Sequence, residues 1–383
     1  MTIAIVVGSL APYTSRVYDA YVERHDTPLH VYGCAAVEPH RQWRIPPPKH
    51  MTYSVLPGLR WHRSDASHLY VNPAILSELR RLKPEMIMIG AFSPTMLGAV
   101  AYARMARVPY GIATDGTLNT DPGLSSKPHA LMRRLMVPGA RFGAGGSPAS
   151  VELLEYWGLK EGLGVTVPVI PSWDAPAVIT DYDARPFDIL FAGGINERYK
   201  GALFFADVMA KLKARGRTFK VRVTGTGPDL EDMKGRLEGA GVTVHFDGAV
   251  QPGEIPAIMS SARLFAFPSR EDPWGLVANE AVLCGTPVLG SPYATSSPYY
   301  VEKFGVGLVR PLEVDAWCTA IEDMLSSRAR YDTFMHRRDE AVRWCSLESG
   351  VDALHEAFEI GRDRTARSAA TRGRQNGRVS VNA

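Results

Sequence analysis

The sequence predicts an α/β fold with two domains, each built on a parallel β-sheet. The chain has 383 residues, enough for two hydrophobic cores. Short apolar runs of strand length alternate with helix-length segments that lack Gly and Pro, which is typical of parallel sheets covered by helices. With 45% hydrophobic and 22% charged residues, the composition is that of a soluble globular protein.

The N-terminal half is expected to begin with a buried strand at 3–7. Gly8 follows this strand, where the lack of a side chain lets a backbone approach a ligand, although one glycine is as often simple turn chemistry. Residues from about 33 to 61 are expected to be irregular, either lining an acceptor site or forming a solvated loop. The other regular elements expected here are helices at 15–23, 73–82, 95–107 and 147–158, and strands at 86–89, 110–113 and 165–170.

Two polar features of this half are candidates for function. Asp115 follows the strand at 110–113 and can accept a hydrogen bond from a substrate hydroxyl, or equally stabilise its own turn. The segment 127–136 alternates basic and apolar residues, which suits either docking on an anionic membrane or an ordinary helix packed on the core.

A Pro-containing stretch at 171–176 ends the strand expected at 165–170 and begins a connection between regular elements. Asp181-Tyr182-Asp183 in this connection has the D-x-D spacing of a metal site. A metal pair of that kind should follow a buried strand, so we interpret these acids as having no metal role.

The stretch 262–292 predicts strand, loop, helix and strand in succession, with the helix at 276–283. Its loop must lie beyond the carboxyl end of a strand and lead into a helix N-terminus, which attracts anions. Asp272 lies in the loop and Glu280 lies in the helix. Because five helical residues rise about 7.5 Å, the two carboxylates can hold opposite ends of a nucleotide-sugar around its diphosphate.

These residues resemble the retaining glycosyltransferases of family 4, also called glycosyl transferases group 1, which have the GT-B fold. The matching motif runs from Asp272-Pro273-Trp274-Gly275-Leu276 through Glu280-Ala281 to Gly285-Thr286-Pro287-Val288. The resemblance implies that Asp272 contacts the donor sugar, that Glu280 binds the ribose, and that Gly275 and Leu276 begin the helix facing the phosphates. The family usually has Glu where this chain has Asp272.

Further loops carry the same resemblance. The family's Arg and Lys, both on the diphosphate, correspond to Gly194 and Lys200, with Arg198 a candidate replacement for the missing Arg. Glycines after a strand, a Lys and the start of the helix at 202–214 suit a phosphate site. The other donor-site positions implied are Gly8, Gly193, Gly225, Gly227 and the backbone near Val250.

The resemblance implies two facing Rossmann-like domains with a cleft between them and a C-terminal helix that crosses back. We therefore expect an acceptor domain at 1–172, a nucleotide-sugar domain at 186–345, a crossover helix at 346–361 and a disordered basic tail at 362–383. Additional helices are expected at 314–325, 329–344 and 347–360.

The implied reaction moves a sugar from a UDP-, GDP- or ADP-sugar to a hydroxyl of a glycan or lipid-linked acceptor, with retention and without a metal or other cofactor. Polysaccharide or glycoconjugate assembly is the expected context. Four scattered cysteines favour a reducing cytoplasm, with peripheral contact at the inner face of the membrane as a further expectation. A net charge of +3 does not indicate a nucleic-acid partner.

Two other functional classes share parts of this pattern. A nicotinamide-dependent oxidoreductase would carry G-x-G-x-x-G after a strand, which this sequence lacks. A non-catalytic scaffold of the same fold that binds sugar nucleotides remains an alternative, because of Gly194 and Asp272.

Overall fold

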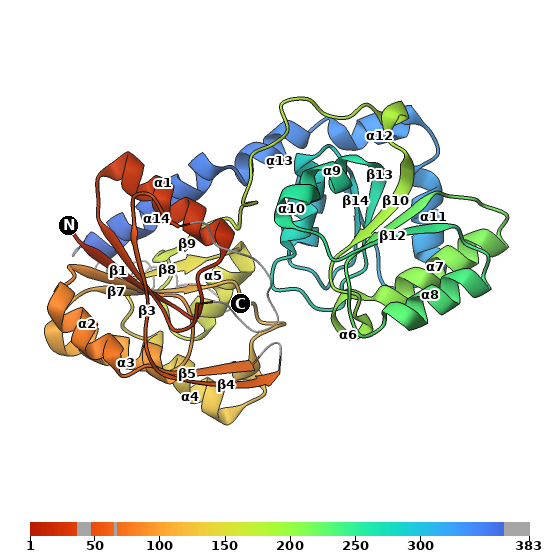
Figure 1. The fold of residues 1–383 in the computed structure, drawn as a ribbon. Helices are drawn as coiled ribbons and strands as arrows, with labels where there is room; N and C mark the ends of the chain where they lie inside the picture. The colour runs from red at the N-terminus through yellow and green to blue at the C-terminus, as the bar shows by residue number, and fades with distance from the viewer. Residues whose placement is uncertain (37–46, 65–66, 364–383) are drawn as a thin grey trace, which may run out of the picture. The chain divides into compact units, whose positions relative to one another are not determined.

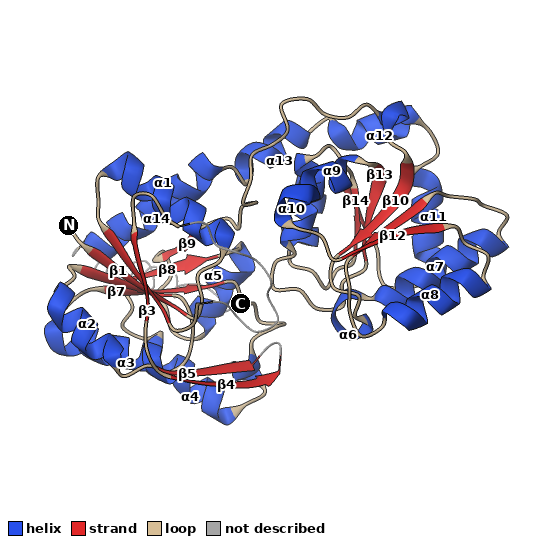
Figure 2. Ribbon diagram, viewed as in Figure 1, coloured by secondary structure: helices blue, strands red, loops and turns tan. Residues whose placement is uncertain are grey.

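The computed structural model describes residues 1–36, 47–64 and 67–363, and the side chains of 62–68 are outside the description. The chain forms two compact units, Met1–Ser172 with Leu347–Ala383, and Trp173–Ser346 (Figure 1). Each unit has a parallel sheet with helices packed against it (Figure 2), so the predicted α/β class is confirmed.

The first unit contains a seven-stranded sheet in the order β3-β2-β1-β6-β7-β8-β9, and every neighbouring pair in it is parallel. The strand order reverses direction between β1 and β6, so loops after these two strands diverge to opposite sides. The strands are β1 Ile3–Val7, β2 Leu29–Gly33, β3 Thr52–Val55, β6 Met86–Ile89, β7 Tyr110–Thr114, β8 Phe142–Gly145 and β9 Gly164–Thr166.

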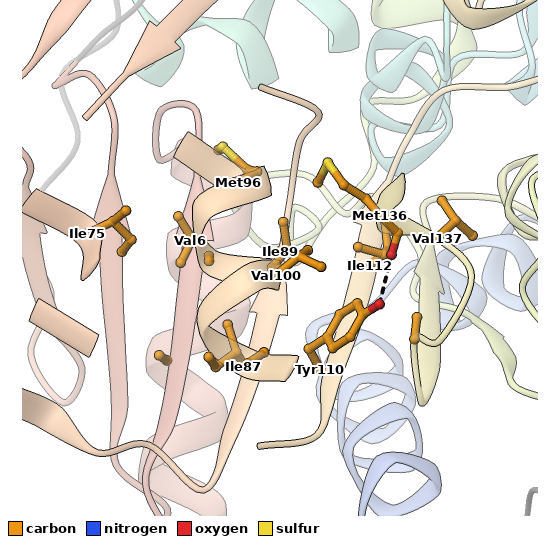
Figure 3. Close-up of a cluster of buried hydrophobic side chains, with 14 of the residues drawn as sticks. Val6, Ile75, Ile87, Ile89, Met96, Val100, Tyr110, Ile112, Met136 and Val137 are labelled. Carbon is orange, nitrogen blue, oxygen red and sulfur yellow. Dashed lines mark hydrogen bonds between the residues drawn. The ribbon is translucent and has the colours of Figure 1, made fainter. Parts of the chain in front are cut away.

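Apolar side chains from this sheet and its helices form a buried cluster (Figure 3). Ile87, Ile89 and Ile112 are fully buried in this cluster, which also contains residues of helix α3, Pro94–Ala106. The Tyr110 hydroxyl donates to the Met136 carbonyl at 3.0 Å, which satisfies a polar group that burial would otherwise leave unpaired (Figure 3).

Helices cover the sheet, and the last of them returns from the end of the chain. In α14, Phe358 packs edge-on against Tyr21 of α1 and Phe142 of β8, with ring centroids 5.3 and 5.7 Å apart. The C-terminal helix therefore belongs to the first unit, as the predicted fold requires. The helices are α1 Pro12–His25, α2 Ala74–Leu82, α3 Pro94–Ala106, η1 Pro122–Leu124, α4 Lys127–Met136, α5 Pro148–Tyr156 and α14 Leu347–Arg362.

The prediction of irregular structure from about 33 to 61 is wrong over much of the described part of that stretch. Strand β3 pairs with β2, and β4 Leu59–Ser64 pairs antiparallel with β5 Ser67–Val71 as a separate hairpin. Most of β3 is exposed, and Leu59 and Trp61 of β4 are exposed as well. Main-chain pairing stabilises these strands without an apolar pattern in the sequence. Residues 37–46 lie outside the described part.

The second unit contains a six-stranded parallel sheet in the order β12-β11-β10-β13-β14-β15. Taken in chain order this is the 3-2-1-4-5-6 arrangement, whose ligand crevice lies at the reversal between β10 and β13. The strands are β10 Phe187–Ala192, β11 Val221–Thr224, β12 Val244–Gly248, β13 Ala262–Phe267, β14 Val288–Gly290 and β15 Gly307–Val309.

The helices of the second unit include two with the predicted bounds, α7 Ala202–Ala214 and α10 Leu276–Leu283. The single helix expected at 329–344 is wrong, since the chain forms α12 Arg328–Met335 and then α13 Arg338–Trp344. No Gly or Pro marks this break, but Arg338 donates to the carbonyls of Val282 and Leu283. The others are α6 Glu197–Lys200, α8 Leu230–Gly239, α9 Ile255–Ser260, α11 Val314–Met324, the 3₁₀ turns η2 Tyr182–Ala184 and η3 Pro252–Glu254, and the π-helical turn η4 Ser297–Glu302.

A buried arginine fixes the segment that leads into this unit. The Arg185 guanidinium donates to the Ala262 carbonyl at 2.6 Å, the Thr286 hydroxyl at 2.7 Å and the Cys284 carbonyl at 3.0 Å. Burial lowers the pKa of Arg185. The acceptors belong to β13, to the end of α10 and to the turn before β14, so one side chain joins the entering segment to three elements.

Loops after β10 and β11 lie so close that glycine is required. Gly225 has φ 130°, and a Cβ there would lie 1.9 Å from the Gly193 carbonyl oxygen. We expect Gly225→Ala to lower the free energy of unfolding by about 2 kcal/mol or more, because both backbone strain and overlap oppose it. Thermal melts check this.

Gly235→Ala is the matched control, since Gly235 lies exposed inside α8 with no atom within 4 Å of an added Cβ. This change should raise stability by about 0.5–1 kcal/mol through helix propensity. Equal melting temperatures for the two variants would contradict the close loop packing.

Candidate functional site

The loops after β10, β13 and β14 meet at the carboxyl edge of the second sheet. Asp272 forms a parallel bridge with Ala294. Its amide donates to the Tyr293 carbonyl at 3.3 Å, and its carbonyl accepts from the Thr295 amide at 3.2 Å. The main chain of Asp272 is thereby fixed to the loop after β14.

The side chain of Asp272 is fixed by the end of helix α6, which follows β10. Its Oδ2 accepts from Lys200 Nζ at 2.5 Å, and Asp272 is 9% exposed. The Tyr199 carbonyl accepts from the Arg270 amide at 2.8 Å and from the Ser269 hydroxyl at 3.0 Å. The structure therefore brings together two of the predicted site residues, Lys200 and Asp272, which lie 72 positions apart in the chain.

Gly193 and Gly194 border open space. A Cβ built on either glycine would meet no atom within 4 Å, and Gly194 is exposed. Arg198, the predicted replacement for an arginine at Gly194, is exposed and lies over the Tyr199 ring at 5.3 Å. In the described part of the chain Arg198 has no ion-pair partner, so its guanidinium is available to an anion.

The start of α7 differs from the sequence expectation. Glu197 Oε2 accepts from the amides of Leu203 and Phe204 at 2.7 and 3.0 Å, while Oε1 accepts from Arg270. A carboxylate of the protein therefore already caps the helix end that the sequence assigned to phosphate. The start of α10 lies at the same edge of the sheet.

Gly275 begins α10 in the left-handed region with φ 90°. A Cβ there would lie 2.6 Å from the Phe267 ring, so this position needs glycine. The next two amides, of Leu276 and Val277, open the first helical turn, whose first amides have no acceptor in a preceding turn, whereas the Ala278 amide donates to the Gly275 carbonyl at 3.0 Å. Trp274 is 4% exposed and its indole donates to Asn279 at 3.2 Å, so this part of the motif builds the core.

Gly225 and Gly227 shape the neighbouring loop. A Cβ on Gly227 would lie 2.1 Å from the Ile195 carbonyl oxygen, as close as the approach of Gly225 to Gly193. Both glycines are therefore required for the packing of these loops. This role is separate from the donor-site role that the sequence predicted for them. Val250 is partly exposed after β12.

Glu280 lies one turn into α10 and has an unusual carboxyl group. Burial raises its pKa to about 7, and a hydrogen bond from the Trp173 side chain opposes this rise. The residue as a whole keeps some exposed surface. Sequence reasoning missed Trp173, because no local pattern relates it to a helix more than a hundred residues later.

The remaining candidates lie in the first unit. A Cβ on Gly8 would lie 3.1 Å from the Tyr70 ring, and the Gly8 carbonyl accepts from the Ala35 amide at 2.9 Å. Asp115 is exposed beyond the end of β7. The predicted carboxyl-edge position of both residues agrees with the structure.

Two charged motifs have structural partners. Asp181 and Asp183 of the D-x-D motif pair with Arg328 at 2.6 and 3.0 Å. Arg133, counted among the basic residues of 127–136, is 5% exposed and bonds Asp121 at 2.6 Å. This charge is paired inside the core. Arg133 therefore does not contribute to the basic face predicted for the segment 127–136.

Comparison with known proteins gives one family match. A family model described as glycosyl transferases group 1 matches residues 186–327. The chain is 37% identical over 91 residues to a 2-deoxystreptamine glucosyltransferase of Streptomyces kanamyceticus, covering 23% of this chain and 24% of that protein. It is 25% identical over 281 residues to the sulfoquinovosyl transferase SQD2 of Arabidopsis thaliana, covering 68% and 53%. The chain thus spans about half or less of these relatives.

Solved structures are similar over almost the whole chain. HepE of Anabaena in complex with UDP has a TM-score of 0.73 at 16% identity, with 94% of this chain and 100% of that chain covered. WaaG, a glycosyltransferase involved in lipopolysaccharide biosynthesis, has a TM-score of 0.64 at 13% identity, with 94% and 99% covered. The predicted GT-B fold, with its two Rossmann-like units, is confirmed. Across the described residues, no helix combines the length and apolarity needed to span a membrane.

The raised pKa of Glu280 predicts a pH effect on stability. The folded protein holds this proton more tightly than the unfolded chain, so the contribution is complete below about pH 4.5 and is lost as pH rises through about 7. Glu280→Gln cannot ionise. Its melting temperature relative to the unaltered protein should therefore increase between pH 5 and pH 8.

Glu238→Gln provides the control, because Glu238 is exposed on α8. Its difference from the unaltered protein should stay constant over the same range. If Glu280→Gln behaves as the control does, the Glu280 carboxyl is not desolvated in the folded protein.

Proposed function

We propose that the chain, whose residues 186–327 belong to the glycosyl transferases group 1 family, moves a sugar from a nucleoside-diphosphate-sugar to a hydroxyl of a glycan or lipid-linked acceptor. The transfer proceeds with retention at the anomeric carbon and without a metal or other cofactor. Its context is polysaccharide or glycoconjugate assembly.

One observation carries this proposal. Lys200 Nζ and Asp272 Oδ2 lie 2.5 Å apart, where the strand order reverses between β10 and β13 and beside the start of α10. A cation and a helix N-terminus suit a diphosphate, while a nearby carboxylate suits sugar hydroxyls. Open space at Gly193 and Gly194 leaves room for a ligand to approach the main chain there.

The chemistry proposed is a front-face displacement. The bond between the anomeric carbon and the β-phosphate oxygen breaks, and the acceptor oxygen bonds to the same face of that carbon. The acceptor proton passes to the departing phosphate, which leaves as the nucleoside diphosphate. Lys200, Arg198 and the start of α10 stabilise the developing negative charge, and Asp272 orients the sugar.

Glu280 is assigned to the ribose and Asp115 to a substrate hydroxyl. The donor is a UDP-, GDP- or ADP-sugar, and UDP-sugars are the first to test. HepE of Anabaena, similar in fold, has been solved with UDP and with UDP-glucose, which supports this order of testing.

A non-catalytic scaffold that binds sugar nucleotides is the second candidate. Gly194 offers no charge where the family has an arginine, and Arg198 rests over Tyr199. Neutralisation of the leaving group then depends heavily on Lys200, whose ammonium is already paired with Asp272. Binding without turnover would identify the scaffold.

Lys200→Ala tests the donor site. Loss of one charge-assisted contact to phosphate should weaken UDP-glucose binding about tenfold to a hundredfold in metal-free calorimetry. Lys234→Ala is the control, because Lys234 is paired with Glu231 on α8. Equal affinities in the two variants would remove Lys200 from the site.

Turnover is measured on the unaltered protein with UDP-, GDP- and ADP-sugars. Slow release of one nucleoside diphosphate supports the transferase. Thermal stabilisation without release, even with added acceptor glycans, favours the scaffold instead.

Peripheral contact with the inner face of the cell membrane is part of the proposal and concerns α4. Leu131 and Leu135 are 57% and 41% exposed, and Lys127 and Arg134 are exposed on the same helix. Apolar side chains beside cations suit the surface of an anionic bilayer. The chain is accordingly expected to work in the cytoplasm with its acceptor at the membrane.

Leu131→Ser with Leu135→Ser should reduce co-sedimentation with phosphatidylglycerol vesicles several-fold, because the two exposed apolar side chains that would enter the bilayer surface are lost. Val178→Ser is the control, since Val178 is 83% exposed in the second unit. Equal partitioning of the unaltered protein to neutral and anionic vesicles would contradict docking.

A further inference from the structure

The hairpin of β4 and β5 lies at the carboxyl edge of the first sheet. It connects the end of β3 to α2, and β1, β2 and β3 are parallel, so the chain enters the hairpin at the edge where Gly8 follows β1 (Figure 2). A Cβ added at Gly8 would lie 3.1 Å from the Tyr70 ring of β5. The Tyr70 carbonyl accepts from the Thr95 hydroxyl of α3 at 3.0 Å. Because α3 follows β6, Tyr70 joins the loop after β1 to the helix after β6.

This position coincides with the reversal of strand order in the first sheet, where open parallel sheets bind their ligands. The base of the hairpin is fixed there. The side-chain amide of Asn72 donates to the carbonyls of Leu56 and Cys34 at 3.0 and 3.3 Å. A Cβ added at Gly58 would lie 2.5 Å from the Val71 carbonyl oxygen, so the two ends of the hairpin are in close contact.

The face of the hairpin that points away from Tyr70 is apolar. Cross-strand pairing places Trp61 opposite Leu69 and Leu59 opposite Val71 on this face. Leu59, Trp61 and Leu69 are 60%, 55% and 44% exposed. An antiparallel pair of strands usually turns its apolar face toward the core and its polar face toward water. The orientation is inverted here, and adjoining exposed apolar side chains of this kind mark a binding surface.

Arg60 lies on the opposite face, paired in register with Tyr70. It is exposed, and within the described ranges it has no ion-pair partner. Arg60 stands between Leu59 and Trp61 in β4. A ligand that passes over the edge of β4 can therefore contact a cation on one face and apolar side chains on the other. This combination suits a molecule in which an anionic group is joined to an apolar chain.

The size of the apolar face decides between a small occupant and a protein chain. Three side chains that are about half exposed offer on the order of 300 Å² of apolar area. A stable protein–protein interface takes about 800 Å² from each partner. The apolar face therefore fits a hydrocarbon chain better than a second copy of this protein.

We propose that the β4–β5 hairpin binds the acceptor, and that the acceptor is an anionic amphiphile. Its apolar chain lies on the face of Leu59, Trp61 and Leu69, and its anionic group pairs with Arg60. Because Arg60 shares a face with Tyr70, the anionic group lies on the side of the hairpin that contacts Gly8. This inference rests on the proposed function and narrows its acceptor from a glycan or lipid-linked molecule to a lipid-linked one that carries an anionic group.

The first experiment uses n-decyl phosphate below its critical micelle concentration, in calorimetry without a donor. The unaltered protein should bind it more tightly than inorganic phosphate, which lacks the chain, and than n-decyl maltoside, which lacks the anion. Trp61→Ser with Leu69→Ser should weaken n-decyl phosphate binding at least about tenfold, because the contacting apolar area is lost. Met105→Ser is the matched control, since Met105 is 72% exposed on α3 of the same unit.

The second experiment tests the cation. Arg60→Gln should weaken n-decyl phosphate binding about tenfold through loss of a charge-assisted contact, and it should leave n-decyl maltoside binding unchanged. Arg80→Gln, which changes an exposed arginine on α2, is its control. All hairpin variants should keep the melting temperature and the UDP-glucose affinity of the unaltered protein, because the proposed donor site belongs to the second unit. These two measurements separate loss of the acceptor site from a folding defect.

Several outcomes would overturn the acceptor site. Equal affinities for n-decyl phosphate and inorganic phosphate would remove the role of the apolar face, and an equal loss in Met105→Ser would show that the hairpin is not the binding surface. If the hairpin variants lose co-sedimentation with vesicles but keep n-decyl phosphate binding, the apolar face contacts the bilayer instead. If they lose self-association in sedimentation velocity but keep n-decyl phosphate binding, a second copy occupies it.

The donor screen separates this inference from the proposed function. Binding of a nucleoside-diphosphate-sugar without binding of n-decyl phosphate overturns the acceptor site alone. Absence of binding to UDP-, GDP- and ADP-sugars by the unaltered protein overturns the proposed function, and the acceptor role of the hairpin with it.

Discussion

The candidate site depends on how Asp272 is held. Its main chain bonds the loop after β14, and its carboxylate bonds Lys200 at the end of helix α6, which follows β10. A carboxylate that is 9% exposed would be costly without a cation, so the ion pair offsets much of the desolvation that this position imposes. Three loops are thereby ordered before any ligand arrives, and a ligand that recruits Lys200 must supply an interaction at least as favourable.

Close packing of the loops sets the rest of the geometry. Glycines 225, 227 and 275 each stand where a Cβ would overlap a neighbouring residue, so these parts of the motif are needed for the shape of the edge. Gly193 and Gly194 differ, because nothing lies within 4 Å of a Cβ there. Steric space therefore distinguishes glycines that the packing of the loops requires from glycines that it does not require, a distinction that the letters of the sequence do not carry.

Sequence patterns predicted those features of the fold that neighbouring residues determine. Helices α7 and α10 have the predicted bounds because Gly, Pro and apolar spacing mark both ends. Lys200 and Asp272 were expected at one edge because parallel strands place their carboxyl ends together. The exposed strand β3, the cap of α7 by Glu197 and the bond from Trp173 to Glu280 were missed. The strand β3 and the bond from Trp173 depend on partners far away in the chain, which no window of neighbouring residues reveals. Glu197 lies only six and seven residues before the amides that it caps, but it reaches them from a separate short helix, α6.

The charge balance at the site follows from which of its charged groups are already paired within the protein. Glu197 satisfies the start of α7 and also engages Arg270, so neither that helix end nor that guanidinium is open to phosphate. The start of α10 and Arg198 contribute positive character at this edge, and Lys200 adds to it while it is paired with Asp272. A donor whose sugar hydroxyls bond Asp272 would loosen that pair and release Lys200 toward the diphosphate. Recognition of the sugar and neutralisation of the leaving group would then be coupled through one ion pair, so that a nucleoside diphosphate lacking its sugar would meet a weaker site than the complete donor.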